Sequence, residues 1–211
     1  MPTSSKFWDK VAKKYAASPI KDMAAYEHTI ERTRSYLTAD TRALEIGCGT
    51  GTTALLLASD VHELVGTDIS AEMVRIASDK AAAQGVQNVT FKVADAPTAA
   101  QDAAEYDVVL GFNIFHLTQN AEGLFKTLHD QLAPGGLFIS KTACLAEPSI
   151  GIKRFAFAVL IPVMRLVGAA PFVRGFRFDQ LESAVENAGF EIIETGSYPA
   201  MSRFIVARKR A

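Results

Sequence analysis

The stretch that decides the fold is Leu44-Glu45-Ile46-Gly47-Cys48-Gly49-Thr50-Gly51, a short apolar run that leads into three alternating glycines. Glycine tolerates positive φ angles and lets the atoms of another molecule approach the backbone, at some entropic cost to folding. Three alternating glycines are hard to explain as an ordinary turn. We interpret the stretch as a strand followed by a ligand-binding loop, with a helix that begins at the last glycine.

Strand-like and helix-like segments alternate after this loop. The pattern predicts helices and strands in chain order at 53–58 (helix), 63–67 (strand), 71–84 (helix), 88–93 (strand), 106–111 (strand), 122–132 (helix) and 137–142 (strand). Strands separated by helices form right-handed βαβ units with helices on both faces of the sheet. The sequence therefore predicts an α/β fold with a doubly wound, mostly parallel sheet.

The rest of the chain surrounds this core, and its length of 211 residues favours one large domain. The predicted parts of that domain, residues 1–211, are two N-terminal cap helices within 1–38 (4–17 and 20–37), the core at 40–143, an insert at 145–178 and a C-terminal region at 179–211. The C-terminal region is predicted to hold a helix at 179–188 and a hairpin of strands 190–195 and 202–207.

Composition excludes several classes of protein. The chain is 49% hydrophobic and 21% charged, which supports a sizeable core and argues against a disordered or collagen-like chain. The net charge of −1 makes nucleic acid an unexpected partner. Two cysteines and four histidines are scattered without ligand spacing, so we expect no metal site. The N-terminus shows no secretory signal, and we expect a cytoplasmic protein.

Two carboxylates follow the strands next to the glycine loop. Asp68 ends the strand 63–67, and Asp95 follows the strand 88–93. Ligands of open parallel sheets bind outside the carboxyl ends of the strands, and a carboxylate there can accept hydrogen bonds from both hydroxyls of a ribose. The pair predicts a pocket for an adenosine-like ligand, although Asp95 taken alone is equally explained as a helix or turn cap.

With the strand 106–110 and Leu132-Ala133-Pro134-Gly135-Gly136-Leu137, these residues resemble the class I S-adenosylmethionine-dependent methyltransferases, most strongly over 40–143. The resemblance implies a seven-stranded sheet whose last strand is antiparallel, S-adenosylmethionine as cofactor, and a small-molecule acceptor of the quinone-precursor or lipid type. It also implies a set of cofactor-binding residues: Glu45, Gly47, Cys48, Gly49, Gly51, Asp68, Ile69, Met73, Asp95, Ala96 and Phe112. Of these, Ile69 and Met73 are also explained as core residues.

Two alternatives to a methyltransferase are an NAD(P)-dependent oxidoreductase and a non-catalytic module that binds S-adenosylmethionine. The dinucleotide fingerprint is G-x-G-x-x-G, whereas the third glycine here comes one residue earlier. A buried carboxylate at Glu45 suits a ligand with an ammonium and a sulfonium better than it suits a pyrophosphate. Both observations disfavour the oxidoreductase, but nothing in the sequence excludes the binding module.

The acceptor is expected beside the segment 111–117, which faces the transferring methyl group in the family that the chain resembles. The segment has neither the (Asp/Asn)-Pro-Pro-aromatic nor the Pro-Cys motif of nucleic-acid methyltransferases, which favours a small-molecule acceptor. Asn113 and His116 are candidates to orient the acceptor, and His116 is a candidate base; packing at a helix start also explains His116. Tyr15, in the aromatic helix 4–17, is a third candidate.

The insert 145–178 is apolar and basic. Phe155, Val159 and Val163 fall on one face of a predicted helix, and lysine and arginine side chains surround them. This combination favours an apolar or amphiphilic acceptor, or peripheral contact with an anionic membrane through 153–177. A lid packed on the sheet and a homodimer interface explain it equally well.

Overall fold

The structure is a computed structural model that describes residues 4–210. Within those residues, seven strands form one sheet: β1 Arg42–Ile46, β2 Glu63–Asp68, β3 Val89–Val93, β4 Val108–Phe112, β5 Leu137–Ala143, β6 Phe190–Gly196 and β7 Ser202–Lys209. Their order is β3-β2-β1-β4-β5-β7-β6. Neighbours pair in parallel except that β7 runs antiparallel to β5 and β6. The predicted doubly wound sheet with one antiparallel strand is confirmed.

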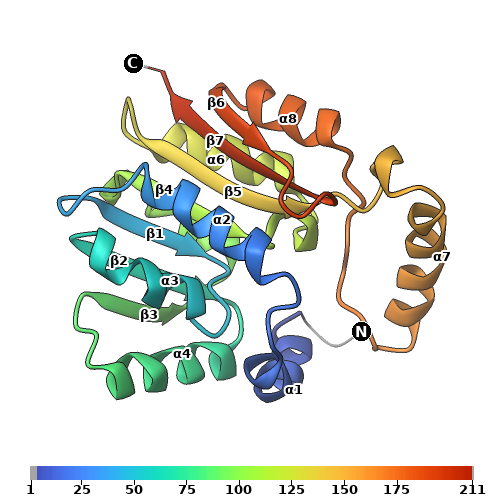
Figure 1. Ribbon diagram of the computed structural model, residues 1–211, viewed down its shortest axis with the longest axis horizontal. Coiled ribbons are helices and arrows are strands. Elements are labelled where there is room, and N and C mark those ends of the chain that lie inside the picture. Colours follow the sequence, from blue (N-terminus) through green and yellow to red (C-terminus); the bar gives the residue numbers. More distant parts are fainter. Residues whose placement is uncertain (1–3, 211) are drawn as a thin grey trace.

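Helices cover both faces of the sheet (Figure 1). They are α1 Ser4–Ala17, α2 Met23–Arg34, α3 Thr52–Leu57, α4 Ala71–Gln84, α5 Ala96–Gln101, α6 Ala121–Gln131, α7 Lys153–Leu166 and α8 Phe178–Asn187, with 3-10 turns η1 Ala58–Asp60, η2 Ala103–Glu105, η3 Phe115–Leu117 and η4 Pro148–Ile150. Helices α2, α3 and α4 lie on one face, and α5, α6 and α8 lie on the other. No helix among residues 4–210 is long and apolar enough to cross a membrane.

Strand alternation decides which side chains reach which face. Ala43 and Ile139 belong to the hydrophobic core beneath α2 and α3, whereas Leu44 belongs to the core on the opposite face. Because successive side chains of a strand point to opposite faces, Glu45 on β1 and Lys141 on β5 point to the same side as Ala43 and Ile139. Two charged side chains therefore face α2 and α3 near the carboxyl ends of the strands.

Two helices differ from the sequence prediction. Helix α2 begins at Met23 rather than at residue 20, because the side chain of Asp22 accepts the Ala25 N–H at 3.0 Å and caps the helix there. Residues 18–22 are consequently a loop that connects α1 to α2. Helix α5 was not predicted, because its six residues are too few to show a helical period.

Candidate functional site

The glycine loop joins β1 to α3 at the carboxyl edge of the sheet. The Cys48 N–H donates to the Thr67 carbonyl at 2.9 Å, which ties the loop to β2. Gly51 has a φ of 73°, and a Cβ there would lie 2.6 Å from the ring of Phe91 and 2.8 Å from Ala77. Gly51 lines neither of the two cavities described below, so its missing side chain serves the packing of α3 and α4 on the sheet. That Gly51 approaches the cofactor stays a prediction.

The first cavity has a volume of about 710 Å³ and lies over β2, β3 and β4. Its wall contains ten of the residues that the sequence singled out: Tyr15, Gly47, Gly49, Asp68, Ile69, Met73, Asp95, Ala96, Phe112 and Asn113. Trp8 of α1 also lines it. Strand ends that are distant in sequence therefore meet around one space, as the parallel sheet requires.

Asp68 is held in place by backbone hydrogen bonds. The Gly49 N–H donates to Oδ2 at 3.0 Å, and the Ser70 N–H donates to Oδ1 at 2.9 Å. Burial raises the pKa of the carboxyl, and backbone hydrogen bonds from Ser70, Gly49 and Ile69 oppose that rise. A carboxylate has about four lone-pair sites, so the group keeps acceptor capacity beyond these three donors. Asp68 thus fixes the glycine loop and can still accept hydrogen bonds from a diol.

Asp95 both caps a helix and lines the cavity, the two alternatives that the sequence left open. Its side chain caps α5 by accepting the Thr98 N–H at 2.9 Å, and hydrogen bonding from Thr98 lowers the pKa of the carboxyl. The residue also lines the first cavity next to Ala96. The cap therefore holds the carboxylate at the cavity wall.

Glu45 is a buried carboxylate whose side chain is 2% exposed. Its Oε2 atom has no hydrogen-bond partner among the described residues. Burial, reinforced by the nearby charge of Asp68 and opposed by a hydrogen bond from the Ala54 backbone, raises the pKa of the carboxyl to about 8. A carboxyl with one oxygen free at a cavity wall is a suitable partner for a cationic ligand group, whose charge favours ionisation of the acid.

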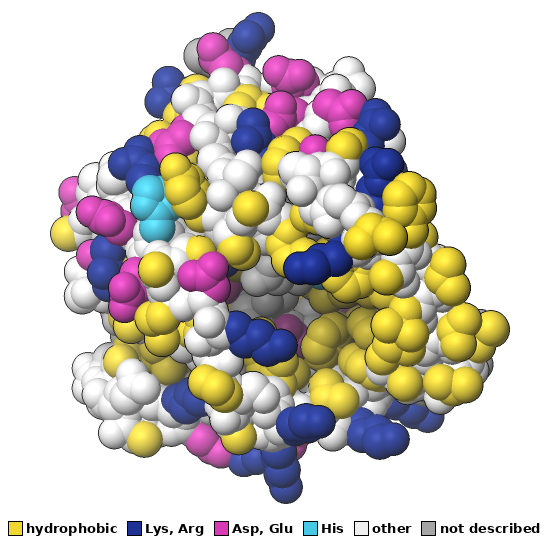
Figure 2. Space-filling view, turned by 45° about the vertical axis from the view of Figure 1, so that its right-hand side comes forward, with side chains coloured by type: hydrophobic (Ala, Val, Ile, Leu, Met, Phe, Trp, Pro, Cys, Tyr) yellow, Lys and Arg dark blue, Asp and Glu magenta, His cyan; other side chains and the backbone are white. Residues whose placement is uncertain are grey.

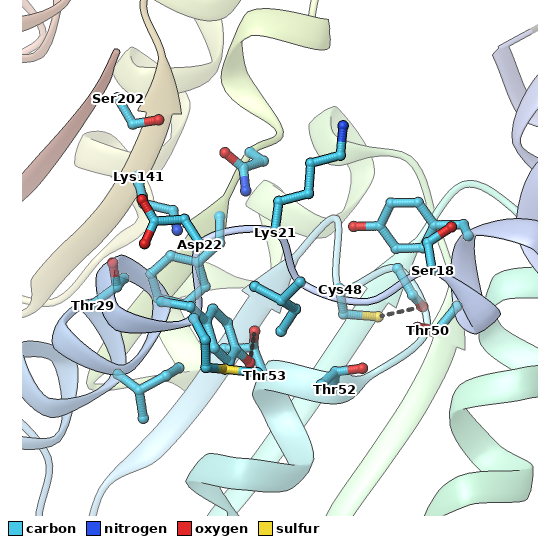
Figure 3. Close-up of a pocket in the computed structure, with 18 of the residues that line it drawn as sticks. Ser18, Lys21, Asp22, Thr29, Cys48, Thr50, Thr52, Thr53, Lys141 and Ser202 are labelled. Carbon is cyan, nitrogen blue, oxygen red and sulfur yellow. Dashed lines mark hydrogen bonds between the residues drawn. The ribbon is translucent and has the colours of Figure 1, made fainter. Parts of the chain in front are cut away.

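A second cavity, of about 640 Å³, lies on the α2 side of the loop. Its wall combines Glu45 and Cys48 with the 18–22 loop, α2 and Lys141 (Figure 3). The two cavities share five lining residues: Tyr15, Gly47, Gly49, Phe112 and Asn113. The cavities therefore adjoin at the glycine loop and at the end of β4.

Asn113 stands at this junction in an unusual backbone conformation. Its φ is 59°, the one positive value among non-glycine residues of the described chain. Its N–H donates to the Lys141 carbonyl at 2.7 Å, which extends the pairing of β4 with β5 by one residue. Non-glycine residues with positive φ concentrate at functional sites, which is consistent with the predicted position of Asn113 beside the acceptor.

His116 is not brought together with the other predicted residues. It lies in η3 and lines neither cavity. Burial lowers the pKa of its imidazole to about 4, and Nδ1 has no partner among the described residues. A neutral side chain inside the protein explains its position as packing, the alternative that the sequence already offered. The structure gives no contact through which His116 would act as a base.

Helix α1 closes the first cavity and is anchored by a residue that sequence reasoning missed. Asp9 accepts the Ser70 hydroxyl at 2.6 Å and the Glu72 N–H at 3.1 Å, at the N-terminus of α4. Trp8 and Tyr15 lie on the same helix and line the cavity. A carboxylate one residue after an aromatic side chain is the only sequence signal for this anchor.

The insert 145–178 does not cover either cavity. None of its residues lines them, and α7 projects at the side of the molecule (Figure 1). Figure 2 shows hydrophobic side chains gathered on that side, next to a hollow. The exposed apolar residues there are Ile152, Phe155, Val159, Leu160, Val163, Leu166 and Val167. A lid function of this segment stays a prediction.

Comparison with known sequences supports the predicted similarity of the core to methyltransferases. Residues 43–136 match the family described as methyltransferase domain. The 2-heptyl-1-hydroxyquinolin-4(1H)-one methyltransferase of Mycobacteroides abscessus is 33% identical over 98 residues, 46% of this chain and 43% of that protein. The ubiquinone biosynthesis O-methyltransferase of Sinorhizobium fredii is 25% identical over 153 residues, 72% of this chain and 61% of that protein. The chain thus spans 43% and 61% of these curated relatives.

A solved structure extends the similarity to the fold. The S-adenosylmethionine-dependent methyltransferase of Mesorhizobium loti aligns with a TM-score of 0.69 at 18% identity, covering 87% of this chain and 97% of that one. The alignment covers more of the chain than the matched domain does. Residues 43–136 thus match the methyltransferase domain family, and the chain as a whole has the α/β fold of a solved S-adenosylmethionine-dependent methyltransferase.

Proposed function

We propose that the protein transfers a methyl group from S-adenosylmethionine to a small apolar or amphiphilic acceptor. The observation that carries the proposal is the meeting of the two cavities at the glycine loop and Asn113. One cavity has the acids at successive strand tips that suit an adenosine. The other offers adjoining space for a second molecule.

The residues of the first cavity fit the nucleoside part of the cofactor. Asp68 would hold the ribose diol with its free lone pairs, and Asp95 with the Ala96 backbone would meet the adenine. Glu45 lines the adjoining second cavity, and its free Oε2 would accept a hydrogen bond from the ammonium group of the methionine part. When bound, S-adenosylmethionine supplies a methyl group already activated by a sulfonium.

The protein's contribution to the reaction is positioning and exclusion of water. Trp8 and Tyr15 cover the cofactor cavity from α1, and Asn113 stands where the two cavities adjoin. Holding two reactants in line at contact distance removes most of the entropic barrier to their reaction. No imidazole lines either cavity among the described residues, so the proposed reaction uses no histidine base.

The acceptor class is inferred from the second cavity and from two of the relatives. Apolar side chains form much of the cavity wall, among them Ile20, Met23, Ile30, Phe112 and Pro199. Those two relatives are named for a heptyl-hydroxyquinolinone and for ubiquinone biosynthesis, whereas another relative is named for protein L-isoaspartate. We extend that acceptor class to this chain.

The test is a methyltransferase assay with a panel of acceptors. The purified protein is incubated with S-adenosylmethionine and with hydroxyquinolones, catechols, alkyl acids and hydrophilic amines, and S-adenosylhomocysteine and methylated products are measured by mass spectrometry. We expect turnover of apolar acceptors. Turnover of hydrophilic acceptors alone would contradict the acceptor class, and tight cofactor binding without turnover would favour the binding module.

The oxidoreductase alternative makes a different prediction. Only the true cofactor stabilises the fold by mass action. We expect S-adenosylhomocysteine to raise the melting temperature and NAD(P) to leave it unchanged. The matched family and the aligned structure are both methyltransferases and give the oxidoreductase no support.

We also propose that α7 contacts an anionic membrane surface, from which an apolar acceptor would be collected. Phe155, Val159 and Leu166 are between 59% and 76% exposed, and α7 contains Lys153 and Arg154 but no acidic residue. Exposed apolar side chains with flanking cations suit an anionic interface.

Cosedimentation with vesicles tests the membrane contact. The protein should bind vesicles that contain anionic phosphatidylglycerol more than neutral phosphatidylcholine vesicles, and a Phe155→Ser, Val159→Ser double variant should lose the difference. Equal binding of both vesicle types would refute the proposal. A concentration-dependent dimer in light scattering, abolished by the same double variant, would instead assign this face to a second copy of the chain.

A further inference from the structure

Lys141 is a buried cation in the second cavity that the reaction described above does not use. It lies on β5, and its side chain is 7% exposed. It lines the cavity together with Ser202 of β7, and Figure 3 shows both side chains on the sheet side of the space, with Asp22 and Thr29 on the α2 side. Burying an ammonium without a counter-ion is costly, so a buried lysine normally has a charged or hydrogen-bonding partner.

No residue of the described chain neutralises this ammonium by direct contact. Lys141 has neither a hydrogen bond nor an ion pair through its side chain within residues 4–210, and its nearest described interaction is the ring of Tyr26, 5.9 Å from Nζ. Asp22 attracts it electrostatically, but the Asp22 carboxylate caps α2 through the Ala25 N–H and makes no ion pair with it. Burial lowers the pKa of Lys141, and Asp22 opposes that effect.

The other charged side chains that line the cavity also form no ion pair with Lys141. Lys21 lies in the loop that precedes α2 and adds a second cation. Glu45 stands on β1, and β4 lies between β1 and β5 in the sheet. Glu45, with one free carboxyl oxygen, and Lys141 therefore line the same cavity on strands separated by a third, and they form no ion pair with each other.

This arrangement leads to our inference, which rests on the proposed function. We propose that the Lys141 ammonium binds an anionic group of the acceptor, a carboxylate or an ionised hydroxyl, at the β5 wall of the second cavity. The Ser202 side chain is buried, lines the same cavity and makes no side-chain hydrogen bond to another described residue, which leaves its hydroxyl available to the same anion. The acceptor is then an apolar acid: its apolar body contacts Ile20, Met23 and Phe112, and its charge meets Lys141.

Binding of matched acids and amides tests the inference. The probes are 3,4-dihydroxybenzoate with 3,4-dihydroxybenzamide, and octanoate with octanamide, titrated calorimetrically into protein saturated with S-adenosylhomocysteine. In at least one pair, we expect the wild type to bind the acid about tenfold more tightly than the amide. Lys141→Met should bind acid and amide equally and keep its affinity for S-adenosylhomocysteine. Lys141→Arg, which keeps the cation, should retain the preference.

The control is Lys92→Met, which removes an exposed lysine of β3 that lines neither cavity and should behave as the wild type does. An acid preference that persists in Lys141→Met would overturn the inference, as would the absence of any preference in the wild type. A loss of S-adenosylhomocysteine affinity in Lys141→Met would also overturn it, by assigning the ammonium to the cofactor's carboxylate. Failure of the proposed function is distinguishable, because the wild type would then not bind S-adenosylhomocysteine at all.

Discussion

Replacing Glu45 with glutamine should stabilise the protein increasingly as the pH rises. Burial raises the pKa of this carboxyl to about 8, against an ordinary value of 4.5. An acid with a raised folded-state pKa contributes stability that is present below 4.5 and lost as the pH rises towards 8, because the unfolded chain gives up its proton first. Each pH unit within that window is worth about 1.4 kcal/mol.

Over the interval from pH 5 to pH 8, the wild type should therefore lose about 3 kcal/mol of unfolding free energy through Glu45 alone. Glutamine does not titrate, so the difference between Glu45→Gln and the wild type should change by that amount in favour of the variant. Any pH-independent effect of the amide cancels in this comparison. Urea unfolding at pH 5, 6, 7 and 8 measures it.

The control is Glu27→Gln, because Glu27 is exposed on α2. Its difference from the wild type should stay constant across the same pH range. A Glu45→Gln difference that varies by less than about 0.5 kcal/mol between pH 5 and pH 8 would refute the assignment of a buried, neutral carboxyl. The gain in stability should be accompanied by weaker binding of S-adenosylhomocysteine, by about tenfold to a hundredfold, since the amide of glutamine cannot form the charge-assisted hydrogen bond of a carboxylate with the ammonium group.

Three further substitutions test the geometry of the site. Asp68→Ala should weaken S-adenosylhomocysteine binding about tenfold to a hundredfold in calorimetry, and unchanged affinity would remove Asp68 from the site. Gly51→Ala should destabilise the fold by about 2 to 4 kcal/mol through the clash with Phe91 and the positive φ, whereas Gly85→Ala, with a similar φ and open space, should cost less in the same urea unfolding experiment. Asp9→Ala should speed hydrogen exchange in α1 and lower cofactor affinity while leaving exchange in the sheet unchanged; protection of α1 at the wild-type level would show that Asp9 does not anchor it.

The site residues that could be predicted from the sequence are those that directly follow a strand or end one. Glu45 and the glycine loop follow β1 directly, and Asp68 ends β2, so the parallel sheet alone brings them to one edge. The same reasoning placed Asp95 and Ala96 at the cavity wall. The motif alone did not show that Gly51 also meets a packing requirement, because a Cβ there would lie against the ring of Phe91, a residue of β3.

His116 shows that residues close in sequence need not line the same cavity. It follows Asn113 by three residues, and Asn113 lines both cavities whereas His116 lines neither. The positive φ of Asn113 and the 3-10 turn that follows it redirect the chain between the two residues. A backbone change of this kind has no hydrophobic period and leaves no trace in a pattern of residue types.

Lys141 is the opposite case. The sequence shows that it is an unusual residue for a buried strand, but its surroundings depend on segments that are distant in the sequence. A lysine within the strand Leu-Phe-Ile-Ser-Lys-Thr contradicts the expectation of an apolar buried strand, and that contradiction marks it for a function. Whether such a lysine is buried among partners or faces a cavity depends on α2 and on β7, which come from opposite ends of the chain. Glu45 poses the same problem on β1.

A fold chosen for stability alone would have apolar residues at both positions, since replacing buried charges with apolar side chains is often neutral or stabilising. Two such ionisable groups, on the same face of the sheet and in one cavity, are therefore best explained by ligands of complementary charge, a cationic cofactor group at Glu45 and an anionic acceptor at Lys141.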